Sequence, residues 1–373
     1  MKGEIYLVRV LQIVDSMDCG GIQSFIMNVF REAKKKGVVF DFLVTVSRKC
    51  EYDEEIKNLG GKIYRVPSRR EGILKNIIEL RKFFLSHNYE CVHLHASSPS
   101  YIEPLIMSKK FNIPKRVLHS HSSSNVNSLY HRIMSSIYRP KLKKIATDYL
   151  ACSEEAAKWM YGKYIPSEDI VIIPNSIPID DFKFDKNDRD KIRRELGIAN
   201  ELVIGHVGRF VHAKNHEKIV DVFFNYYSRN PESVLLLVGD GVLKKEVKEK
   251  VVRLGIEKNV IFTGIRHDIY NLLKAMDIFI MPSYYEGLPV TLVEAQASGL
   301  PCVVSDSITK EVKVSDLITY ISLDSELDEW LNKINIDINF NERVEYNEKI
   351  KDTKFQVKNV LENLLKIYEV NIK

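Results

Sequence analysis

Short apolar segments alternate with helical hydrophobic patterns from one end of this chain to the other, and this alternation constrains its fold more than any other feature. It predicts parallel β-sheets covered by helices, because parallel strands need a long crossover connection that is usually a helix. The first strand is expected at 6–14, followed by a Gly-rich turn and a helix over 22–36 that Gly37 ends. Further strands of the first half are expected at 40–46, 62–66, 90–95, 116–121 and 148–152.

A Pro-containing segment at 173–178 separates this half from a second α/β half. Its strands are expected at 202–207, 234–238, 260–262, 277–281 and 301–304. Two such halves in 373 residues imply two lobes facing a cleft, 1–174 and 175–348. The stretch 328–348 shows no clear pattern, whereas 349–369 is predicted to be a helix with an apolar stripe. Ligands of open parallel sheets bind outside the carboxyl ends of the strands, where every motif described below falls.

The bulk composition is that of a globular protein, with 45% hydrophobic and 28% charged residues. No apolar run reaches the roughly 18 to 20 residues that a membrane-spanning helix needs, and the charged start of the chain is unlike a secretory signal. The cysteines are odd in number and form no C-x-x-C pair, which favours free thiols in a reducing cytoplasm. They are Cys19, Cys50, Cys91, Cys152 and Cys302.

Two acids, Glu286 and Glu294, flank a predicted helix start that follows the strand at 277–281. Pro289 suits the first turn of that helix, and the free amides around Gly287, Leu288 and Pro289 would form an anion site. Carboxylates beside a phosphate site are better explained as acceptors for hydroxyl groups on either side of it. A sugar at one end of a diphosphate and a ribose at the other meet that description. The alternative interpretation is that Glu294 is a solvated helix residue and Glu286 a helix cap.

A second motif follows the strand at 202–207, where Gly208 and Arg209 are succeeded five positions later by Lys214. A guanidinium and an ammonium at this spacing can clamp a diphosphate without a metal. The one Asp-x-Asp, at 188–190, lies in a charged helical stretch rather than at a strand end, so we expect no metal site. Surface charges without function are the alternative interpretation.

Two His-x-His units end the strands at 90–95 and 116–121, and in each unit both histidines lie on one face. We expect the outer histidines, His95 and His121, to reach into the cleft, and the inner ones, His93 and His119, to be packed. Such pairs also occur as zinc ligands, so a zinc site is a second interpretation. No acidic cluster at ligand spacing accompanies them.

A Gly-Gly turn, Gly20-Gly21, joins the first strand to its helix and would let the backbone approach a ligand closely. Neither the complete dinucleotide fingerprint nor the P-loop pattern is present.

Residues 101–150 carry nine basic and two acidic residues, interleaved with apolar residues at 129–138. Contact with an anionic membrane surface and a solvated helix face are both open interpretations. Binding of nucleic acid is disfavoured, because no recognition motif accompanies the charge.

Together these motifs resemble the GT-B glycosyltransferases of family 4, and the resemblance covers nearly the whole chain. It is closest to members that build capsules and exopolysaccharides, especially through 294–301. The residues that carry the resemblance lie at 20–21, 93–95, 173–175, 207–209, 214, 238–241, 262–264, 275–283, 286–289, 294–295 and 298–301. Ser176 replaces the glycine usual after Asn175, and the Gly-Gly pair usual near Val304 is absent.

The resemblance implies two Rossmann-like lobes, the second holding the donor and the first the acceptor, with a final helix at about 349–373 returning to the first. It implies a retaining transfer, with Glu286 on the donor sugar, Glu294 on the ribose, and Arg209 and Lys214 on the diphosphate. Amides near Gly20, Gly21 and 287–289 would approach the donor.

By the same resemblance His95 would contact the donor sugar near the reacting carbon, and His121 is favoured over His119 as its companion. The donor is expected to be a UDP-sugar and the acceptor a saccharide or a polyprenyl-diphosphate-linked saccharide. The enzyme would then work in the cytoplasm, docked on the inner face of the membrane through residues 101–150.

Three other functions stay open. A sugar-nucleotide epimerase or phosphorylase has the same two-lobe fold, and a non-catalytic nucleotide-sugar-binding protein would show the same binding residues. An NAD-dependent oxidoreductase would need the glycine fingerprint that this chain lacks.

Overall fold

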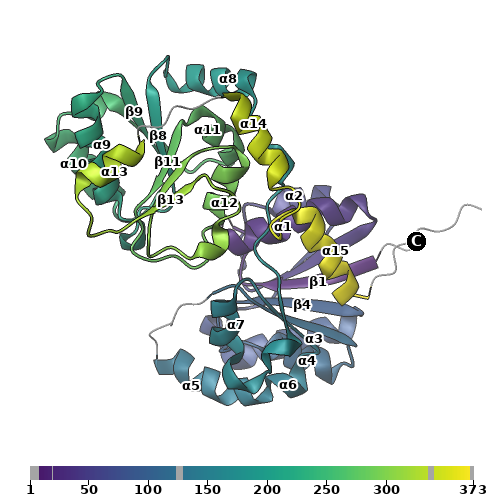
Figure 1. The fold of residues 1–373 in the computed structure, drawn as a ribbon. Helices are drawn as coiled ribbons and strands as arrows, with labels where there is room; N and C mark the ends of the chain where they lie inside the picture. Colours follow the sequence, from purple (N-terminus) through teal and green to yellow (C-terminus); the bar gives the residue numbers. More distant parts are fainter. Residues whose placement is uncertain (1–7, 19, 123–128, 335–339, 370–373) are drawn as a thin grey trace, which may run out of the picture. The chain divides into compact units, whose positions relative to one another are not determined.

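A computed structural model describes residues 8–18, 20–122, 129–334 and 340–369, so the start of the expected first strand and Cys19 lie outside the described residues. The chain divides into two compact units (Figure 1). Unit 1 comprises Met1–Ile177 and Lys354–Lys373, and unit 2 comprises Pro178–Thr353.

Unit 1 contains a parallel seven-stranded sheet in the order β3-β2-β1-β4-β5-β6-β7. Every strand expected in this half is present, and its central strands are apolar and buried, as a sheet covered on both faces requires. The short β7 was not expected, because its three residues run directly into the Pro-containing segment. The strands are β1 Val8–Val14, β2 Val38–Val44, β3 Ile63–Arg65, β4 Cys91–Ala96, β5 Lys115–Ser120, β6 Asp148–Ala151 and β7 Ile170–Ile172.

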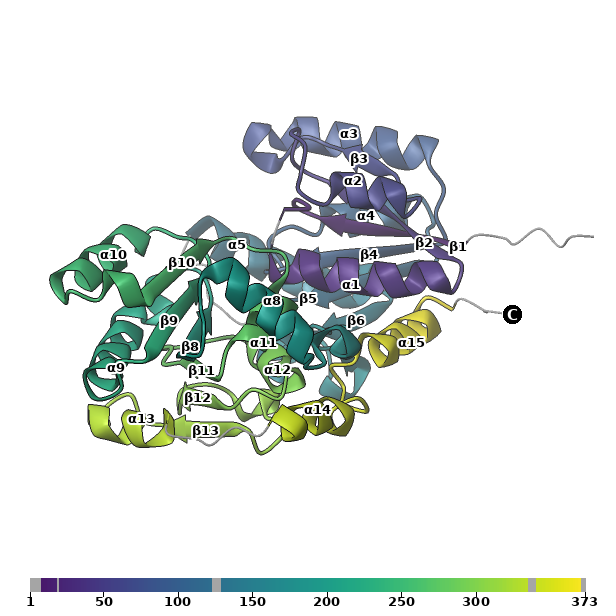
Figure 2. The same ribbon diagram turned by 90° about the horizontal axis from the view of Figure 1, so that it is seen from above.

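Helices cover both faces of this sheet and form two cores (Figure 2). On one face α1 and α15 pack side by side, and Lys36 just beyond α1 forms an ion pair with Glu362 of α15. The other face is covered mainly by α3, α4, α6 and α7. The helices of unit 1 are α1 Gly21–Lys35, α2 Asp53–Asn58, α3 Ile73–Ser86, α4 Glu103–Lys110, α5 Leu129–Tyr138, α6 Leu142–Ile145, α7 Glu154–Tyr161 and α15 Val357–Ile367, with the 3-10 turn η1 Arg69–Glu71.

The last helix is shorter than its pattern predicts, since α15 begins at Val357 and not at residue 349. The chain just before it is extended and bridges to Ile177: the amide of Ile177 donates to the carbonyl of Phe355, and the amide of Val357 donates to that of Ile177. These two bonds use backbone groups that a longer helix would need. The predicted stripe, including Val360, Leu361 and Leu364, packs on the core of unit 1.

Unit 2 contains a parallel six-stranded sheet in the order β10-β9-β8-β11-β12-β13. All five expected strands are present, and β13 is an additional one whose mixed sequence Ile-Thr-Tyr-Ile gave no clear strand pattern. The strands are β8 Leu202–Val207, β9 Ser233–Val238, β10 Val260–Gly264, β11 Ile278–Met281, β12 Cys302–Ser305 and β13 Ile318–Ile321. The helices are α8 Lys186–Leu196, α9 His216–Arg229, α10 Lys244–Arg253, α11 Ile269–Ala275, α12 Val290–Ala297, α13 Leu327–Ile334 and α14 Phe340–Lys349.

Two helices, α13 and α14, occupy the stretch that showed no sequence pattern. Trp330 and Leu331 of α13 are buried in the core of unit 2. Arg343 of α14 is buried as well, and its guanidinium donates to the carbonyls of Met276 and Ser298. Because a buried position of α14 is an arginine, the apolar periodicity is interrupted and the sequence did not predict this helix.

In both sheets the strand order reverses at the centre, between β1 and β4 in unit 1 and between β8 and β11 in unit 2. Loops that follow the two strands on either side of such a reversal diverge to opposite faces of the sheet, which opens a crevice for ligands at the carboxyl edge. In the part of the chain that the structure describes, no helix is both long and apolar enough to cross a membrane. The four described cysteines are buried and form no disulfide with one another.

A buried ion cluster holds the start of β11 in unit 2, around Asp277. The carboxylate of Asp277 accepts bonds from the guanidinium groups of Arg189 and Arg193, both at 2.5 Å, and from the amide of Val203 at 2.8 Å. Removing one partner of a buried ion pair leaves the remaining charges uncompensated. The resulting loss of folding stability is far larger than the loss on breaking an exposed pair.

We therefore predict that Asp277→Ala lowers the free energy of unfolding of unit 2 by about 3–5 kcal/mol. Asp328→Ala, which breaks the exposed pair with Arg229, should change it by less than about 1 kcal/mol. Urea unfolding followed by the fluorescence of the buried Trp330, in a Trp159→Phe background, measures both variants. Equal losses in the two variants would contradict this assignment.

Candidate functional site

Two loops of unit 2 follow β8 and β11, the strands that flank the reversal of strand order. They are joined by hydrogen bonds: the amide of Tyr284 donates to the carbonyl of Ala213 at 2.9 Å, and the side chain of Asn215 donates to the carbonyl of Pro282 at 3.1 Å. The ring of His212 also stacks on that of Tyr284. The residues predicted after β8 and those predicted after β11 therefore belong to one continuous surface.

Close backbone packing supports the first of these loops. Gly239, after β9, has a φ of +133°, and a Cβ atom there would lie 2.1 Å from the carbonyl oxygen of Gly208. Only glycine is compatible with that approach. The loop that carries Arg209 and Lys214 is thus held against the neighbouring strand end.

Lys214 and Glu286 form a direct ion pair, with 2.7 Å between the ammonium nitrogen and Oε1. The hydroxyl of Ser283 donates to the same oxygen at 2.7 Å. Both charged side chains are largely buried, so the pair orients each partner firmly. The sequence motifs placed these two residues in separate roles and did not predict their contact.

The guanidinium of Arg209 is exposed, and no hydrogen bond or ion pair holds it within the described parts of the chain. It lies in the same loop as Lys214 and keeps its donors free for an anion.

Helix α12 begins at Val290, directly after Pro289, so Pro289 occupies the capping position and not the first turn as expected. No side chain caps this helix start. Uncapped amides and the helix dipole favour an anion at this point. Gly287 is exposed before it, and Leu288 is half-buried.

Glu294 lies on the second turn of α12 and is half-buried. Burial raises the pKa of its carboxyl to about 7. No hydrogen bond to its carboxylate is found among the described residues, whereas Glu286 is paired. A desolvated carboxylate without a partner is suited to accept hydrogen bonds from ligand hydroxyl groups.

In unit 1 the Gly-Gly turn forms the uncapped start of α1. Gly20 has an extended backbone, with φ at −178°, so its conformation does not require glycine. A Cβ atom on Gly21 would meet only the amide of Asn175, at 4.0 Å. At Gly20 a Cβ atom would lie 2.5 Å from Oε1 of the Gln23 side chain, so the open space beside the helix amides is at Gly21.

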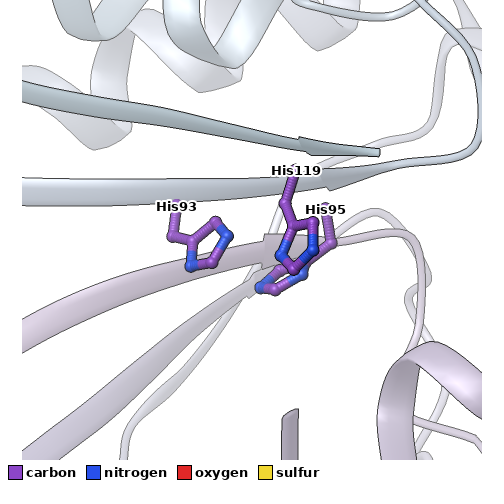
Figure 3. Close-up of side chains that lie close together, drawn as sticks. All are labelled: His93, His95 and His119. Carbon is purple, nitrogen blue, oxygen red and sulfur yellow. The ribbon is translucent and has the colours of Figure 1, made fainter. Parts of the chain in front are cut away.

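Two histidines of β4, one of β5 and His121 just after β5 gather on one face of the sheet, and Figure 3 shows the first three. The ring of Phe25 contacts those of His95, His119 and His121. His93 and His119 are fully buried, His95 is nearly so, and His121 is half-buried. His95 uses both ring nitrogens: Nε2 bonds to Oε1 of Gln12 and Nδ1 to Nε2 of His121, each at 2.8 Å.

The hydrogen bonds continue at both ends of this cluster. Nδ1 of His121 lies 3.2 Å from the side-chain oxygen of Asn175, and Nδ1 of His93 lies 2.7 Å from the hydroxyl of Tyr368. The motifs did not single out Gln12 or Tyr368. A polar residue within the otherwise apolar stretch 10–14 of β1 was the only signal for Gln12.

Burial lowers the pKa of His93, His95 and His119 well below the ordinary value, and the neighbouring histidines lower it further. Burial also lowers the pKa of His121 to about 4. The cluster is therefore neutral at physiological pH, and its tautomers are set by the hydrogen-bond partners.

Of the two His-x-His units that suggested zinc, the structure brings His93, His95 and His119 together, with one ring nitrogen of each within 4.8 Å of those of the other two. Since both nitrogens of His95 are hydrogen-bonded, Nε2 of His93 and Nδ1 of His119 are the nitrogens of this trio left without a partner in the described structure. Two ligands fall short of the three or four that zinc sites in proteins provide.

Comparison with known proteins gives matches along most of the chain. The family model described as "Glycosyltransferase Family 4" matches residues 19–181, and that described as "Glycosyl transferases group 1" matches residues 188–334. EpsF of Bacillus subtilis, named as a glycosyltransferase, is 34% identical over 333 residues, covering 87% of this chain and 86% of EpsF.

Two further proteins are similar, the first in sequence over part of the chain and the second in structure over nearly all of it. The UDP-Gal:alpha-D-GlcNAc-diphosphoundecaprenol alpha-1,3-galactosyltransferase of Escherichia coli is 31% identical over 241 residues, 62% of each chain. The crystal structure of Anabaena Alr3699/HepE in complex with UDP-glucose superposes with a TM-score of 0.78 at 19% identity, covering 97% of this chain and 99% of that one. At that identity the superposition shows the two-domain GT-B fold.

The raised pKa of Glu294 yields a prediction for stability. Below its ordinary pKa of 4.5 the carboxyl is protonated in both the folded and the unfolded chain, and as the pH rises towards about 7 the folded chain alone retains the proton and loses stability. Glu294→Gln should match the wild type near pH 4 and be more stable at pH 8, by up to roughly 3 kcal/mol. Chemical unfolding across this pH range measures the difference, and Glu329→Gln on the exposed face of α13 is the control. A gain at pH 8 that is also present at pH 4 would contradict the prediction.

Proposed function

The chain belongs to glycosyltransferase family 4, and from that premise we propose that it is a retaining enzyme that transfers a sugar from a UDP-sugar to a saccharide or lipid-linked saccharide. We place this reaction in the synthesis of a capsular polysaccharide or exopolysaccharide. The observation that carries the proposal is the surface beside the strand reversal of unit 2. There a lysine–glutamate pair, an uncapped helix start and an unpartnered carboxylate occur together.

We assign the diphosphate of the donor to Arg209, Lys214 and the amides of 287–289. Lysine has three donors, so Lys214 can keep its bond to Glu286 while it binds a phosphate oxygen. Arg209 has its whole guanidinium available. The free amides of α12 add a third source of positive potential.

We assign the hydroxyl groups of the donor to the two glutamates. Glu286 has one oxygen occupied by Lys214 and Ser283 and retains lone pairs for the hydroxyl groups of the sugar. Glu294, unpartnered and desolvated, accepts the hydroxyl groups of the ribose. Burial has already removed water from this carboxyl, which is why its pKa is raised to about 7, so a bound hydroxyl group displaces less water than at an exposed carboxylate.

In the proposed reaction the bond between the anomeric carbon and the phosphate oxygen breaks while the acceptor oxygen bonds to the same face of that carbon. The acceptor proton passes to the departing phosphate. Arg209, Lys214 and the start of α12 stabilise the negative charge that develops on the diphosphate. This arrangement does not require a metal ion.

From unit 1 we assign four residues to the donor: Gly20 and Gly21 at the open start of α1, and His95 and His121 in the histidine cluster. Since both nitrogens of His95 are engaged, it would contact the donor sugar with the edge of a ring that Gln12 and His121 hold in place. His121 is the more exposed of the two.

The identities of donor and acceptor rest on the similar proteins. The HepE structures contain UDP and UDP-glucose, and the name of the galactosyltransferase of Escherichia coli gives a UDP-sugar donor and a diphosphoundecaprenol-linked acceptor. We propose the same classes for this chain.

We further propose that the enzyme works at the cytoplasmic membrane surface and docks there through α5. Its residues Leu129, Ile133 and Ile137 recur every four positions and are 70%, 51% and 44% exposed, and they form an apolar stripe. Four of the nine basic residues nearby, Lys109, Lys115, Arg116 and Arg139, make internal hydrogen bonds. The exposed ones are Lys109, Lys110, Arg132, Lys141, Lys143 and Lys144.

The donor site is tested by ligand-induced thermal shifts and by transfer assays. We expect UDP and UDP-sugars to raise the melting temperature and NAD to leave it unchanged. Lys214→Ala and Glu286→Ala should each reduce transfer by about 10²–10³-fold, because each removes charge stabilisation or sugar contact at the reacting bond. Arg229→Ala, an exposed residue at the far end of α9, is the control.

Full transfer by either variant would refute the site. Stabilisation by NAD alone would refute the reaction class. Donor turnover without any acceptor would instead indicate an epimerase.

Membrane docking is tested by sedimentation with mixed phosphatidylglycerol and phosphatidylcholine vesicles. Ile133→Asp should weaken binding by about tenfold or more, because it places a charge in the apolar stripe. Leu74→Asp, at a 76% exposed position of α3, should bind like the wild type. Equal binding by the two variants, or no binding by the wild type, would exclude α5 as the anchor.

A further inference from the structure

The loop that follows β11 carries Glu286, and it is held from both of the strands that flank β11 in the sheet. On the side of β8, the amide of Tyr284 donates to the carbonyl of Ala213 at 2.9 Å. On the side of β12, two serine side chains donate to the carbonyl of Ser283. The backbone just before Glu286 is therefore anchored to the loops of both neighbouring strands.

The two serines are Ser305, the last residue of β12, and Ser307 in the turn after it. Their hydroxyl oxygens lie 2.6 and 2.8 Å from the carbonyl oxygen of Ser283 and 2.8 Å from each other. The turn brings both side chains to one acceptor, and it is closed by the amide of Ile308, which donates to the carbonyl of Ser305 at 3.2 Å. A carbonyl oxygen has two lone pairs, so it can accept from both hydroxyl groups at once.

Burial makes these contacts hard to replace. Ser283 and Ser305 are fully buried, so water does not reach this carbonyl when the two hydroxyl groups are removed. A buried acceptor that loses its donors costs folding free energy, and the loop then gains by moving to find another partner.

Ser283 passes this anchoring on to Glu286. Its hydroxyl donates to Oε1 of Glu286 at 2.7 Å, the oxygen that also accepts from Lys214. A chain of hydrogen bonds thus runs from the end of β12, through one residue of the β11 loop, to the carboxylate that we assign to the donor sugar.

The serines stand where the sequence departs from its family. The Gly-Gly pair usual near Val304 is absent, and Ser305, Asp306 and Ser307 follow that residue instead. Glycine has no side chain that could bond to the carbonyl of a neighbouring loop. The two hydroxyl contacts therefore depend on the residues that this chain has in place of that pair.

On these grounds, and resting on the proposed transfer reaction, we propose that Ser283, Ser305 and Ser307 are positioning residues for Glu286. Ser305 and Ser307 hold the carbonyl of Ser283, and the hydroxyl of Ser283 fixes Oε1 of Glu286. The other carboxylate oxygen, Oε2, has no hydrogen bond to the described residues and is presented to the hydroxyl groups of the donor sugar. Because the serines act through Glu286, they affect the sugar of the donor and not its nucleotide.

The first test compares two double variants that differ in a single hydroxyl group. Ser305→Ala with Ser307→Val removes both hydroxyl donors, whereas Ser305→Ala with Ser307→Thr keeps one of them at an exposed position. Isothermal titration gives the Kd of UDP, UDP-glucose, UDP-galactose and UDP-N-acetylglucosamine for each protein. For the UDP-sugar that the wild type binds best, we expect a Kd about tenfold higher in the valine variant than in the threonine variant, the effect of misplacing a charged hydrogen bond.

The Kd of UDP should be the same in both variants, because UDP has no sugar for Glu286 to bind. Ser228→Ala, which removes a hydroxyl that donates to a backbone carbonyl at the far end of α9, is the control for the loss of a serine. Equal UDP-sugar binding by the valine and threonine variants would overturn the proposal. A parallel loss of UDP binding would overturn it too, because a general disturbance of the site weakens both ligands.

The second test is a double-mutant cycle with Glu286→Ala. That variant has no carboxylate to position, so removing the two hydroxyl groups should not weaken its binding of the UDP-sugar any further. The same loss of binding in both backgrounds would show that the serines act independently of Glu286 and would overturn the proposal.

The outcome is separable from that of the proposed function. A wild type that binds UDP-sugars, with serine variants that bind them equally well, refutes the positioning role and not the reaction. A wild type that binds no nucleotide sugar refutes the reaction, and the positioning role with it.

Discussion

The parallel pairing of strands is the constraint on which the rest of this structure depends. It brings the carboxyl ends of all strands in a sheet to one edge, and the reversal of strand order at the sheet centre opens a crevice there. In unit 2 the residues after β8 and β11, on either side of the reversal, include Lys214 and Glu286, and these touch. In unit 1 the residues at the ends of β1 and β4, Asp15 and His95, line one cavity.

The charged side chains of this protein fall into two groups, those that are buried and paired and stabilise the fold, and those that lack a protein partner and are available to a ligand. Asp277 is buried and fully paired with two arginines, and it stabilises unit 2. Glu294 is desolvated, which raises its pKa to about 7, and it has no partner among the described residues. Asp15 lines the cavity of unit 1 and has no side-chain partner in the described ranges either. A carboxylate that gives up water without a protein partner reduces stability, and a ligand that supplies the missing hydrogen bonds restores it.

For the histidine cluster, the sequence motif predicted where the side chains lie but not which groups they bond to. Its strands and the shared face of His93 and His95 follow from period-2 geometry. Its hydrogen bonds do not, because Gln12 comes from another strand and Tyr368 lies just after α15, 275 residues beyond His93 in the chain. Those partners decide that both nitrogens of His95 are occupied.

The sequence by itself determined the alternation of strands and helices, the two α/β halves and the family, because periodicity and motif spacing are local properties of the chain. It did not reveal α14, whose Arg343 is buried, or the start of α15, which the bridge to Ile177 delays. Only the tertiary structure decided that Lys214 is bound to Glu286 and that Asp15 lines a cavity together with His95. It also decided that neither Glu294 nor Asp15 has a side-chain partner in the part of the chain that is described. Each of these depends on contacts between residues far apart in the chain, and no local pattern encodes such contacts.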